Sequence, residues 1–284
     1  MMKKTVIFII LLLLSASFAC CESLSGLTVT YLDVGQGDAI LVQCDGQAMM
    51  IDGGDYLYSL QVLSFLKNSL PGNRIDYLVC THPHNDHAGG LNGILSAFTV
   101  GKVYANVTDS DLPGFRFFAH TLRQKKKSLT VPPFGLSLPL GTAQVTFLSD
   151  DEAYMSDNDR SLIVRVVYGN TSFLFMGDAE AVAEERLRIT GQDIGSTVLK
   201  VGHHGSSIAA NDTFLDAVRP QFAVISVGQN NDFGHPDAET VHRLENAGVK
   251  IYRTDLHGSV TAVSDGFQVT FTTEKDPLAG GEAE

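Results

Sequence analysis

Hydrophobic and polar residues alternate in three short segments near the start of the chain, and a helical spacing follows them. The alternating segments lie at 27–34, 39–44 and 47–52. Such alternation is typical of strands with one buried face, and the glycines and aspartates between the segments favour turns. Leucines at helical spacing then predict a helix over 57–70 that stops at Pro71. We therefore expect an antiparallel opening followed by a helix.

Strands and helices alternate through the rest of the chain. The apolar runs 75–80 and 102–106 predict strands on either side of a helix through 88–98. The segment 161–178 predicts a hairpin that turns on a Gly-Asn pair. Further helices are expected at 179–189, 214–219 and 236–248, with strands at 197–201 and 222–228 and three short strands at the end.

The order of these elements predicts the architecture. Two strand-rich blocks, each interleaved with helices, indicate two sheets packed face to face with helices outside. The second block repeats the first, with a hairpin, a helix and then a strand that ends in histidines. We expect an α+β fold, a four-layer αββα sandwich, in one domain over 25–274, followed by a loose acidic tail at 275–284.

The first residues have the pattern of a secretory signal peptide. Lys3 and Lys4 precede an apolar run, and small residues follow up to Ala19. The run is shorter than the roughly 20 residues that a bilayer-spanning helix needs, which disfavours a retained anchor. We expect cleavage to remove 1–19 and to leave an extracytoplasmic, secreted protein with no stable membrane span. Lipid attachment at Cys20 would instead hold it at the outer face of the cell membrane.

Charge and cysteine content narrow the classes of protein. The formal net charge is −12 at pH 7, so a broad electropositive surface for nucleic acid is not expected. The basic run at 123–127 is either a solvated helix end or a track for phosphates. Cys44 and Cys80 lie in apolar, strand-like runs, which indicates buried thiols and no disulfide framework.

Three histidines and an aspartate lie within six residues after the apolar run 75–80. A loop at the carboxyl end of a buried strand is where α/β sheets place ligands. His82 and His84 can face one cation from extended backbone, while Asp86 and His87 turn toward a second. Two adjacent cations can hold a hydroxide at neutral pH and stabilise the charge that develops during hydrolysis. Imidazole with carboxylate suits zinc, and added carboxylates also admit manganese or iron.

The pattern H-x-H-x-D-H after a strand resembles the signature of the metallo-β-lactamase fold hydrolases. Other segments are similar to the hydrolase domain of the ComEC-type competence proteins, and this resemblance extends from about residue 28 to residue 266. They are TYLDVGQGDAILVQ at 30–43, IDGGD at 51–55, the hairpin with its flank at 161–180, LKVGHHGS at 199–206 and the stretch 222–260. The membrane-spanning domains of full ComEC proteins are not in this sequence, so we expect a free-standing, secreted relative.

The resemblance implies further metal ligands in the second half of the chain. Asp178 matches the bridging carboxylate of the family, although an aspartate before a helix can also serve as its N-cap. Either His203 or His204 would complete the second cation site. Extended backbone would point these two side chains in opposite directions, which would leave one as a ligand and its neighbour as a supporting or substrate-binding group.

A histidine that many metallo-β-lactamase enzymes place in the middle of the chain is missing here. Between residues 88 and 177 the only histidine is His120, which we expect on a helix face. The ComEC-type pattern offers 157–162 instead, where Asn158, Asp159 or Ser161 would give a weaker or water-filled coordination. The first cation would then be held loosely or recruited with substrate, and Asn158 and Ser161 would be free to bind that substrate.

Other residues of the family pattern are candidates for contact with substrate. Asp33 and Gln36, together with Asp38, would line the mouth of the site, unless the segment is only a glycine-flanked hairpin. Lys200 would meet a phosphate oxygen or cap a buried carboxylate. His235, on a loop before a helix, would donate a proton to the leaving group or would simply begin that helix.

The resemblance favours hydrolysis of phosphodiesters, and nuclease action on DNA is the activity that it implies. Two divalent cations, zinc or manganese, would hold the attacking hydroxide, with Asp86 among the catalytic residues. Two alternatives stay open. One is hydrolysis of carboxyl derivatives such as lactams, lactones or thioesters, since the fold supports several reactions. The other is a non-catalytic, metal-bearing module that binds a partner.

Overall fold

The computed structural model describes residues 26–149 and 156–276. The predicted signal peptide at 1–19, Cys20 and most of the predicted tail lie outside these ranges. Within them, no helix combines the length and the apolar content that crossing a bilayer requires. The first three strands pair in antiparallel fashion, as their alternation predicts.

The larger sheet has eight strands in the order β15-β14-β1-β2-β3-β4-β5-β6. Pairing is antiparallel from β15 to β3 and parallel from β3 to β6. Its strands are β1 (Leu27–Tyr31), β2 (Ile40–Cys44), β3 (Gln47–Ile51), β4 (Arg74–Cys80), β5 (Thr99–Ala105), β6 (Leu129–Thr130), β14 (Val260–Ser264) and β15 (Val269–Thr273).

The smaller sheet has seven strands in the order β13-β12-β11-β10-β9-β8-β7. It too is divided, because β13 to β10 pair in parallel and β10 to β7 pair in antiparallel fashion. Its strands are β7 (Ser137–Leu140), β8 (Ala143–Phe147), β9 (Val164–Tyr168), β10 (Thr171–Phe175), β11 (Val198–Lys200), β12 (Phe222–Ile225) and β13 (Lys250–Arg253).

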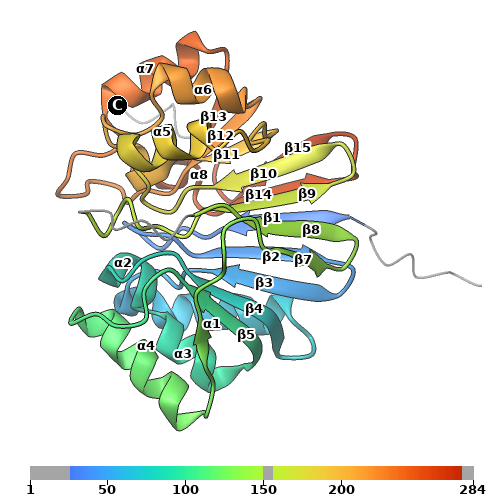
Figure 1. Ribbon diagram of the computed structural model, residues 1–284, viewed down its shortest axis with the longest axis vertical. Helices are drawn as coiled ribbons and strands as arrows, with labels where there is room; N and C mark the ends of the chain where they lie inside the picture. Colours follow the sequence, from blue (N-terminus) through green and yellow to red (C-terminus); the bar gives the residue numbers. More distant parts are fainter. Residues whose placement is uncertain (1–25, 150–155, 277–284) are drawn as a thin grey trace, which may run out of the picture.

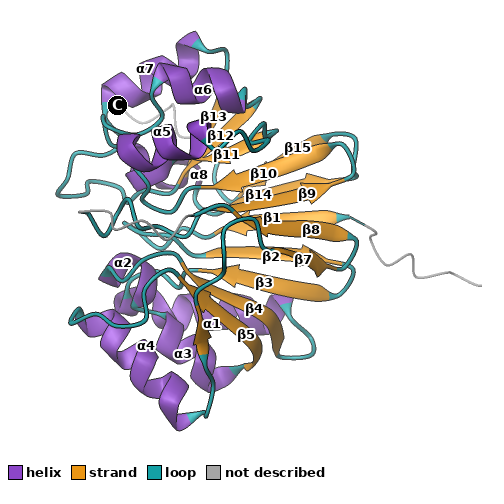
Figure 2. Ribbon diagram, viewed as in Figure 1, coloured by secondary structure: helices purple, strands orange, loops and turns teal. Residues whose placement is uncertain are grey.

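Helices cover the outer faces of both sheets, so the predicted αββα sandwich is confirmed (Figure 2). On the larger sheet they are η1 (Tyr56–Tyr58), α1 (Ser59–Ser69), α2 (Asn85–Ala88), α3 (Leu91–Ala97) and α4 (Pro113–Gln124). In the second half of the chain they are α5 (Ala181–Ile189), η2 (Gly202–Gly205), α6 (Asp212–Val218), α7 (Ala238–Asn246) and α8 (Thr254–His257).

Side-chain alternation divides each strand between two hydrophobic layers. In β4, Val79 packs between the sheets, whereas Leu78 packs against the outer helices. In β10, Phe173 and Phe175 face the layer between the sheets and Leu174 faces the helices on its own side. Because all of these side chains are buried, a shift of one residue in register would expose them. The packing therefore fixes where each following loop begins.

The strands β4, β10 and β11 all end at the same edge of the sandwich, on the left in Figure 1. Their following loops carry the histidines and aspartates singled out by the sequence. Residues from the two halves of the chain are therefore brought to a common edge by strand direction alone.

Two parts of the fold differ from the predicted elements. The helix predicted over 88–98 begins only at Leu91, because α2 ends at Ala88 and the backbone of Gly90 packs against Gly53 with no room for a Cβ. The hairpin of β7 and β8 is not among the predicted elements. Several of its side chains are exposed, and Pro139 interrupts the strand pattern.

Candidate metal centre

The first cluster of predicted ligands lies where β4 ends and α2 begins. His84 begins α2 from extended backbone (φ −60°, ψ 150°), which places Asp86 and His87 on the first turn of that helix. His82 and His87 are completely buried, and His84 and Asp86 are partly exposed. The loop therefore holds two buried imidazoles while the other two side chains reach toward solvent.

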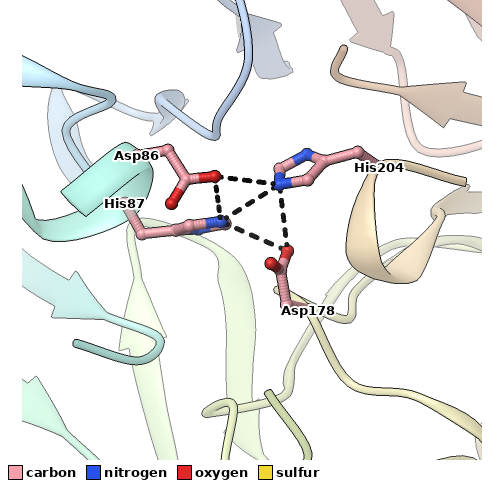
Figure 3. Close-up of side chains that lie close together, drawn as sticks. All are labelled: Asp86, His87, Asp178 and His204. Carbon is pink, nitrogen blue, oxygen red and sulfur yellow. Dashed lines mark hydrogen bonds and ion pairs between the residues drawn. The ribbon is translucent and has the colours of Figure 1, made fainter. Parts of the chain in front are cut away.

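Two residues from the other sheet complete a four-residue group (Figure 3). The ligand atoms of Asp86, His87, Asp178 and His204 all lie within 4.8 Å of one another. His87 Nε2 lies 3.2 Å from Asp178 Oδ1 and 3.4 Å from His204 Nε2. His204 Nε2 lies 3.3 Å from Asp86 Oδ2. Two imidazoles and two carboxylates in this arrangement suit one divalent cation.

Asp178 also belongs to a second group, together with His82 and His84. Its Oδ1 faces His87 and His204, whereas its Oδ2 lies 3.6 Å from His82 Nε2. His82 Nε2 and His84 Nδ1 lie 3.1 Å apart. Asp178 is buried, and its Oδ1 has no hydrogen-bond donor in the part of the chain that the structure describes. Because these buried side chains offer two sets of imidazole and carboxylate ligand atoms that share Asp178, the residues present fit two divalent cations.

Burial and charge act against each other on these titratable groups. Burial disfavours the ionised form of Asp178, yet the imidazoles of His204 and His87 hold the pKa of its carboxyl well below the usual range. Burial likewise opposes protonation of His204, but Asp178 and Asp86 raise the pKa of its imidazole to about 9. Burial, with His87 alongside, holds the pKa of His82 well below its usual value. Buried carboxylates that stay ionised attract a cation, and a metal ion would displace protons from the imidazoles.

Asp52 orients His87 from the side away from the ligand group. His87 Nδ1 donates to Asp52 Oδ2 at 2.9 Å. Thr81 donates to the same carboxylate through its backbone NH at 2.7 Å and its hydroxyl at 2.6 Å. This pairing leaves Nε2 of His87 to face the cluster. Asp52 is not among the residues predicted for the site, and its position directly after β3 is the signal that could have found it.

Replacing Asp52 with asparagine should lower metal affinity. We expect the affinity for Mn²⁺ or Zn²⁺ to fall by about 10- to 100-fold, because His87 loses its charged acceptor. Asparagine tolerates the left-handed backbone of this residue (φ 58°), so the fold should persist. Isothermal titration calorimetry measures the affinity, and a thermal melt checks folding. Unchanged affinity in a folded variant would exclude the orienting role.

His203 and His204 face different surroundings, but the predicted extended backbone is wrong. Both residues adopt left-handed conformations, with φ of 43° and 53°. His204 turns Nε2 to the ligand group and donates through Nδ1 to the carbonyl of Ser226 at 2.9 Å. His203 Nδ1 instead lies 2.7 Å from Glu180 Oε1, which also accepts from Asn158 at 2.8 Å. The geometry therefore favours His204 as the ligand and His203 as its neighbour in the cleft.

Lys200 lies beneath the site rather than in it. Its side chain is completely buried, and its Nζ lies 2.7 Å from Asp38 Oδ2 and donates to the carbonyl of Val201 at 2.9 Å. The predicted contact between Lys200 and a phosphate oxygen is therefore corrected, because the ammonium group has no path to the cleft. The alternative, a lysine that caps a buried carboxylate, matches the structure. Since Asp38 lies before β2 and Lys200 ends β11, the pair joins the two sheets below His87.

A cleft of about 330 Å³ opens above the ligand groups. Two of the residues predicted to contact substrate, Gln36 and His235, line it together with several predicted metal ligands, and so does Phe233, which no sequence pattern had singled out. Burial, with His203 and His204 nearby, lowers the pKa of the His235 imidazole. The cleft thus offers an amide, a neutral imidazole and an aromatic ring to a bound molecule.

Besides Lys200, four residues predicted to contact substrate or to line the mouth of the site do not line this cleft, and those predictions are corrected. One of them is Asp38, which is buried against Lys200. Ser161 is buried, and its hydroxyl accepts from the backbone NH of Asp178 at 2.9 Å, so it positions a ligand residue. Asn158 donates to Glu180 at 2.8 Å. Asp33 accepts from a backbone NH in its own turn at 3.3 Å. Each side chain is engaged within the protein, which sequence spacing does not reveal.

A four-layer αββα sandwich with imidazoles and carboxylates gathered at its strand ends is the arrangement of the metallo-β-lactamase fold. The chain belongs to the metallo-beta-lactamase superfamily, whose family model matches residues 32–229. It is 30% identical to the competence protein ComA of Neisseria gonorrhoeae, over 82% of this chain and 31% of that protein. It is 26% identical to the ComE operon protein 3 of Bacillus subtilis strain 168, over 84% of this chain and 33% of that protein.

The chain spans about a third of the length of these curated relatives, and the matched part is consistent with a ComEC-type hydrolase domain. Among solved structures, the metallo-beta-lactamase fold protein YhfI from Bacillus subtilis aligns with a TM-score of 0.55 at 13% identity. That alignment covers 87% of this chain and 100% of YhfI, and it supports the fold.

Proposed function

We propose that the protein is a secreted, metal-dependent hydrolase that cleaves phosphodiester bonds in DNA. The observation that carries this proposal is the position of Asp178, whose two oxygens face two separate groups of ligand side chains. Two-metal sites of this kind suit the displacement of a phosphate ester, where attacking and leaving oxygens both gain charge. Relatives named as competence and recombination proteins support a nucleic acid as the substrate.

Two divalent cations, zinc or manganese, would be held by the groups that share Asp178. The first group adds Asp86, His87 and His204, and the second adds His82 and His84. When bound, the cations supply Lewis acidity, which lowers the pKa of water and neutralises charge on phosphate oxygens. The group of His82 and His84 contains fewer protein ligands than the group of Asp86, His87 and His204. This agrees with the expectation that the cation at His82 and His84, where the middle histidine is missing, is held more weakly.

Two cleft residues would act on the substrate directly. The carboxamide oxygen of Gln36 accepts from the backbone NH of Gly228 at 3.2 Å, which leaves its NH2 group to donate to a phosphate oxygen. His235 Nδ1 has no hydrogen-bond partner within the described residues. We assign His235 the role of proton donor to the leaving oxygen, since an adjacent phosphate anion would raise its lowered pKa.

A panel of substrates tests the proposed reaction. The metal-loaded protein should release p-nitrophenol from bis-p-nitrophenyl phosphate and shorten single-stranded DNA, while a chromogenic cephalosporin stays intact. EDTA should abolish both activities, and Mn²⁺ or Zn²⁺ should restore them. Hydrolysis of the cephalosporin alone would support the reading as a hydrolase of carboxyl derivatives. Bound metal without hydrolysis of any substrate would support the binding module.

Export is the second part of the proposal, and it is based on the composition of residues 1–19. Expression in a bacterial host followed by mass spectrometry of the extracytoplasmic fraction should find a mature chain beginning near residue 20. A lipid on Cys20 would appear as added mass that a Cys20→Ser variant lacks. An uncleaved chain confined to the cytoplasm would contradict export without affecting the proposed reaction.

A further inference from the structure

Helix α4 lies against the metal-binding loop and leaves its outer face uncovered. Asn85, the first residue of α2, accepts a hydrogen bond from the backbone NH of Gly114 at 2.8 Å. The inner face of α4 is buried through Phe115 and Phe118. Figure 1 shows α4 beside α2 at the lower left of the sandwich. The helix is therefore fixed next to the site, while its opposite face is available for contacts.

The outer face of α4 carries a stripe of two arginines with a histidine between them. Arg116, His120 and Arg123 follow one another at spacings of four and three residues, which places them on one helix face, and all three are exposed. Within the described ranges, neither guanidinium group forms an ion pair or hydrogen bond with another side chain. Beyond the helix, Lys125 and Lys127 of the basic run donate to the backbone carbonyls of Ser96 and Gly101, so the stripe consists of the residues on α4 itself. Because the whole chain has a net charge of −12, the positive charge on α4 is a local feature and does not reflect a generally basic protein.

An apolar pocket of about 520 Å³ lies between the stripe and the metal cleft. Two rings line it, Tyr56 (65% exposed) and Phe117 (63% exposed). Asn85 lines both this pocket and the metal cleft. Phe117 lines both this pocket and an outer hollow that contains Arg116 and Arg123. The shared residues place the three hollows next to one another, with the apolar pocket adjoining both the outer hollow and the metal cleft.

We propose that a single-stranded nucleic acid lies along α4 on its way to the metal centre, with a base stacked in the apolar pocket and phosphates at the arginines. The proposal rests on the proposed phosphodiesterase function and names the form of its substrate. Exposed aromatic rings stack on unpaired bases of any identity, and arginines follow the phosphate backbone. Guanidinium groups also match phosphate geometry with paired hydrogen bonds. A duplex would keep its bases away from Phe117 and Tyr56, so the pocket fits a single strand.

The charges around α4 also indicate where the strand is held most firmly. Lys200 is buried against Asp38 and supplies no charge to the surface. Asp109 and Asp111 line the outer hollow near the start of α4 and oppose a phosphate there. Arg123, at the other end of the helix, is farther along the chain from these carboxylates. We therefore expect Arg123 to bind phosphate more strongly than Arg116.

A binding measurement on the metal-loaded full chain tests this surface. The probe is a fluorescein-labelled phosphorothioate oligothymidine, which resists cleavage, and the readout is fluorescence anisotropy. Phe117→Ala should weaken binding about tenfold, because one stacked base is lost. Arg116→Gln with Arg123→Gln should reduce the slope of log affinity against log salt by about 1.4, which is the value for two phosphate contacts on a single strand.

Matched controls lie elsewhere on the molecule. Phe267 is an exposed ring (81%) on the turn between β14 and β15, at the opposite end of the sandwich (Figure 1), and Lys67 is an exposed cation in the last turn of α1. Phe267→Ala and Lys67→Gln should leave the affinity and the salt slope unchanged. The wild-type chain should also bind the single strand more tightly than a duplex of the same length.

The outcomes test the α4 binding surface and the proposed reaction independently of each other. Equal affinity for single strand and duplex, with no loss in folded Phe117→Ala and arginine variants, would overturn the α4 surface even if bis-p-nitrophenyl phosphate is hydrolysed. Failure of the wild-type chain to hydrolyse that small ester would overturn the proposed reaction. Weakened oligothymidine binding in the same variants would still support the surface.

Discussion

Turnover of bis-p-nitrophenyl phosphate is expected to fall at least ~100-fold when Asp178 is replaced with alanine. Asp178 contributes an oxygen to each of the two ligand groups, so its loss removes one ligand from both. The metal content after dialysis, measured by inductively coupled plasma mass spectrometry, should fall together with turnover. Steady-state kinetics on the same preparation would show whether kcat, rather than KM, carries the loss.

An exposed aspartate provides the matched control. Asp193 pairs with Arg165 at 3.0 Å on the surface, away from the ligand groups, and Asp193→Ala should keep wild-type turnover and metal content. A folded Asp178→Ala variant that retained both metals and most of its turnover would show that Asp178 is not a shared ligand. The N-cap role that the sequence left open would not account for this residue either, because the N-cap of α5 is Glu180.

Replacing Lys200 with methionine is expected to give the largest loss of stability. Asp38 is 1% exposed, and without Lys200 its buried carboxylate would have only the imidazole of His87, 3.9 Å away, beside it. Breaking a buried ion pair by removing one partner costs about 3–5 kcal/mol. In a chain of this size that corresponds to a fall in Tm of roughly 6–20 °C. Differential scanning calorimetry measures the change.

A double variant distinguishes the part of the stability loss that comes from the unpaired charge from the part that comes from altered packing. In Lys200→Met with Asp38→Asn, the uncompensated charge is gone, so part of the lost Tm should return. The exposed pair of Arg188 and Glu185, also 2.7 Å apart, is the control, and Arg188→Met should change Tm far less. If Lys200→Met lowered Tm no more than Arg188→Met, the buried pair would not hold the two sheets together.

Most of the fold could be predicted from the sequence because its strands are buried on a regular pattern. The alternating segments that became β1, β2 and β3 each place one face in the layer between the sheets. The hairpin of β7 and β8 could not be found in this way, because it lies at an edge of its sheet and exposes part of its surface. Hydrophobic alternation fades where a strand has little to bury.

The candidate site was predictable where its residues lie close together in the chain. His82, His84, Asp86 and His87 share one loop, so their spacing alone indicates a metal site. The choice between His203 and His204 depends on a left-handed backbone that the sequence Gly-His-His-Gly does not disclose. A residue such as Asp52, which acts through another side chain, becomes visible only when β3 and β4 lie side by side.

Burial separates the two interpretations of Lys200, and exposure distinguishes the two faces of α4. A lysine near the end of a strand can face a substrate or a carboxylate, and packing of the two sheets buries this one against Asp38. The cations of α4 are exposed instead, because the helix buries Phe115 and Phe118 on its inner face and leaves Arg116 and Arg123 on its outer face. Sequence spacing sets the faces of a helix, but tertiary packing decides which of them meets solvent.

Loops from both sheets are expected to hold one pair of cations through Asp178. Crystals soaked in MnCl2 and measured near the manganese absorption edge test this claim directly. We expect two anomalous difference peaks, one bounded by Asp86, His87, Asp178 and His204 and the other by His82, His84 and Asp178. Peaks away from Asp178, or density that joins residues of only one sheet, would show that the loops of the two sheets do not hold a common pair of cations.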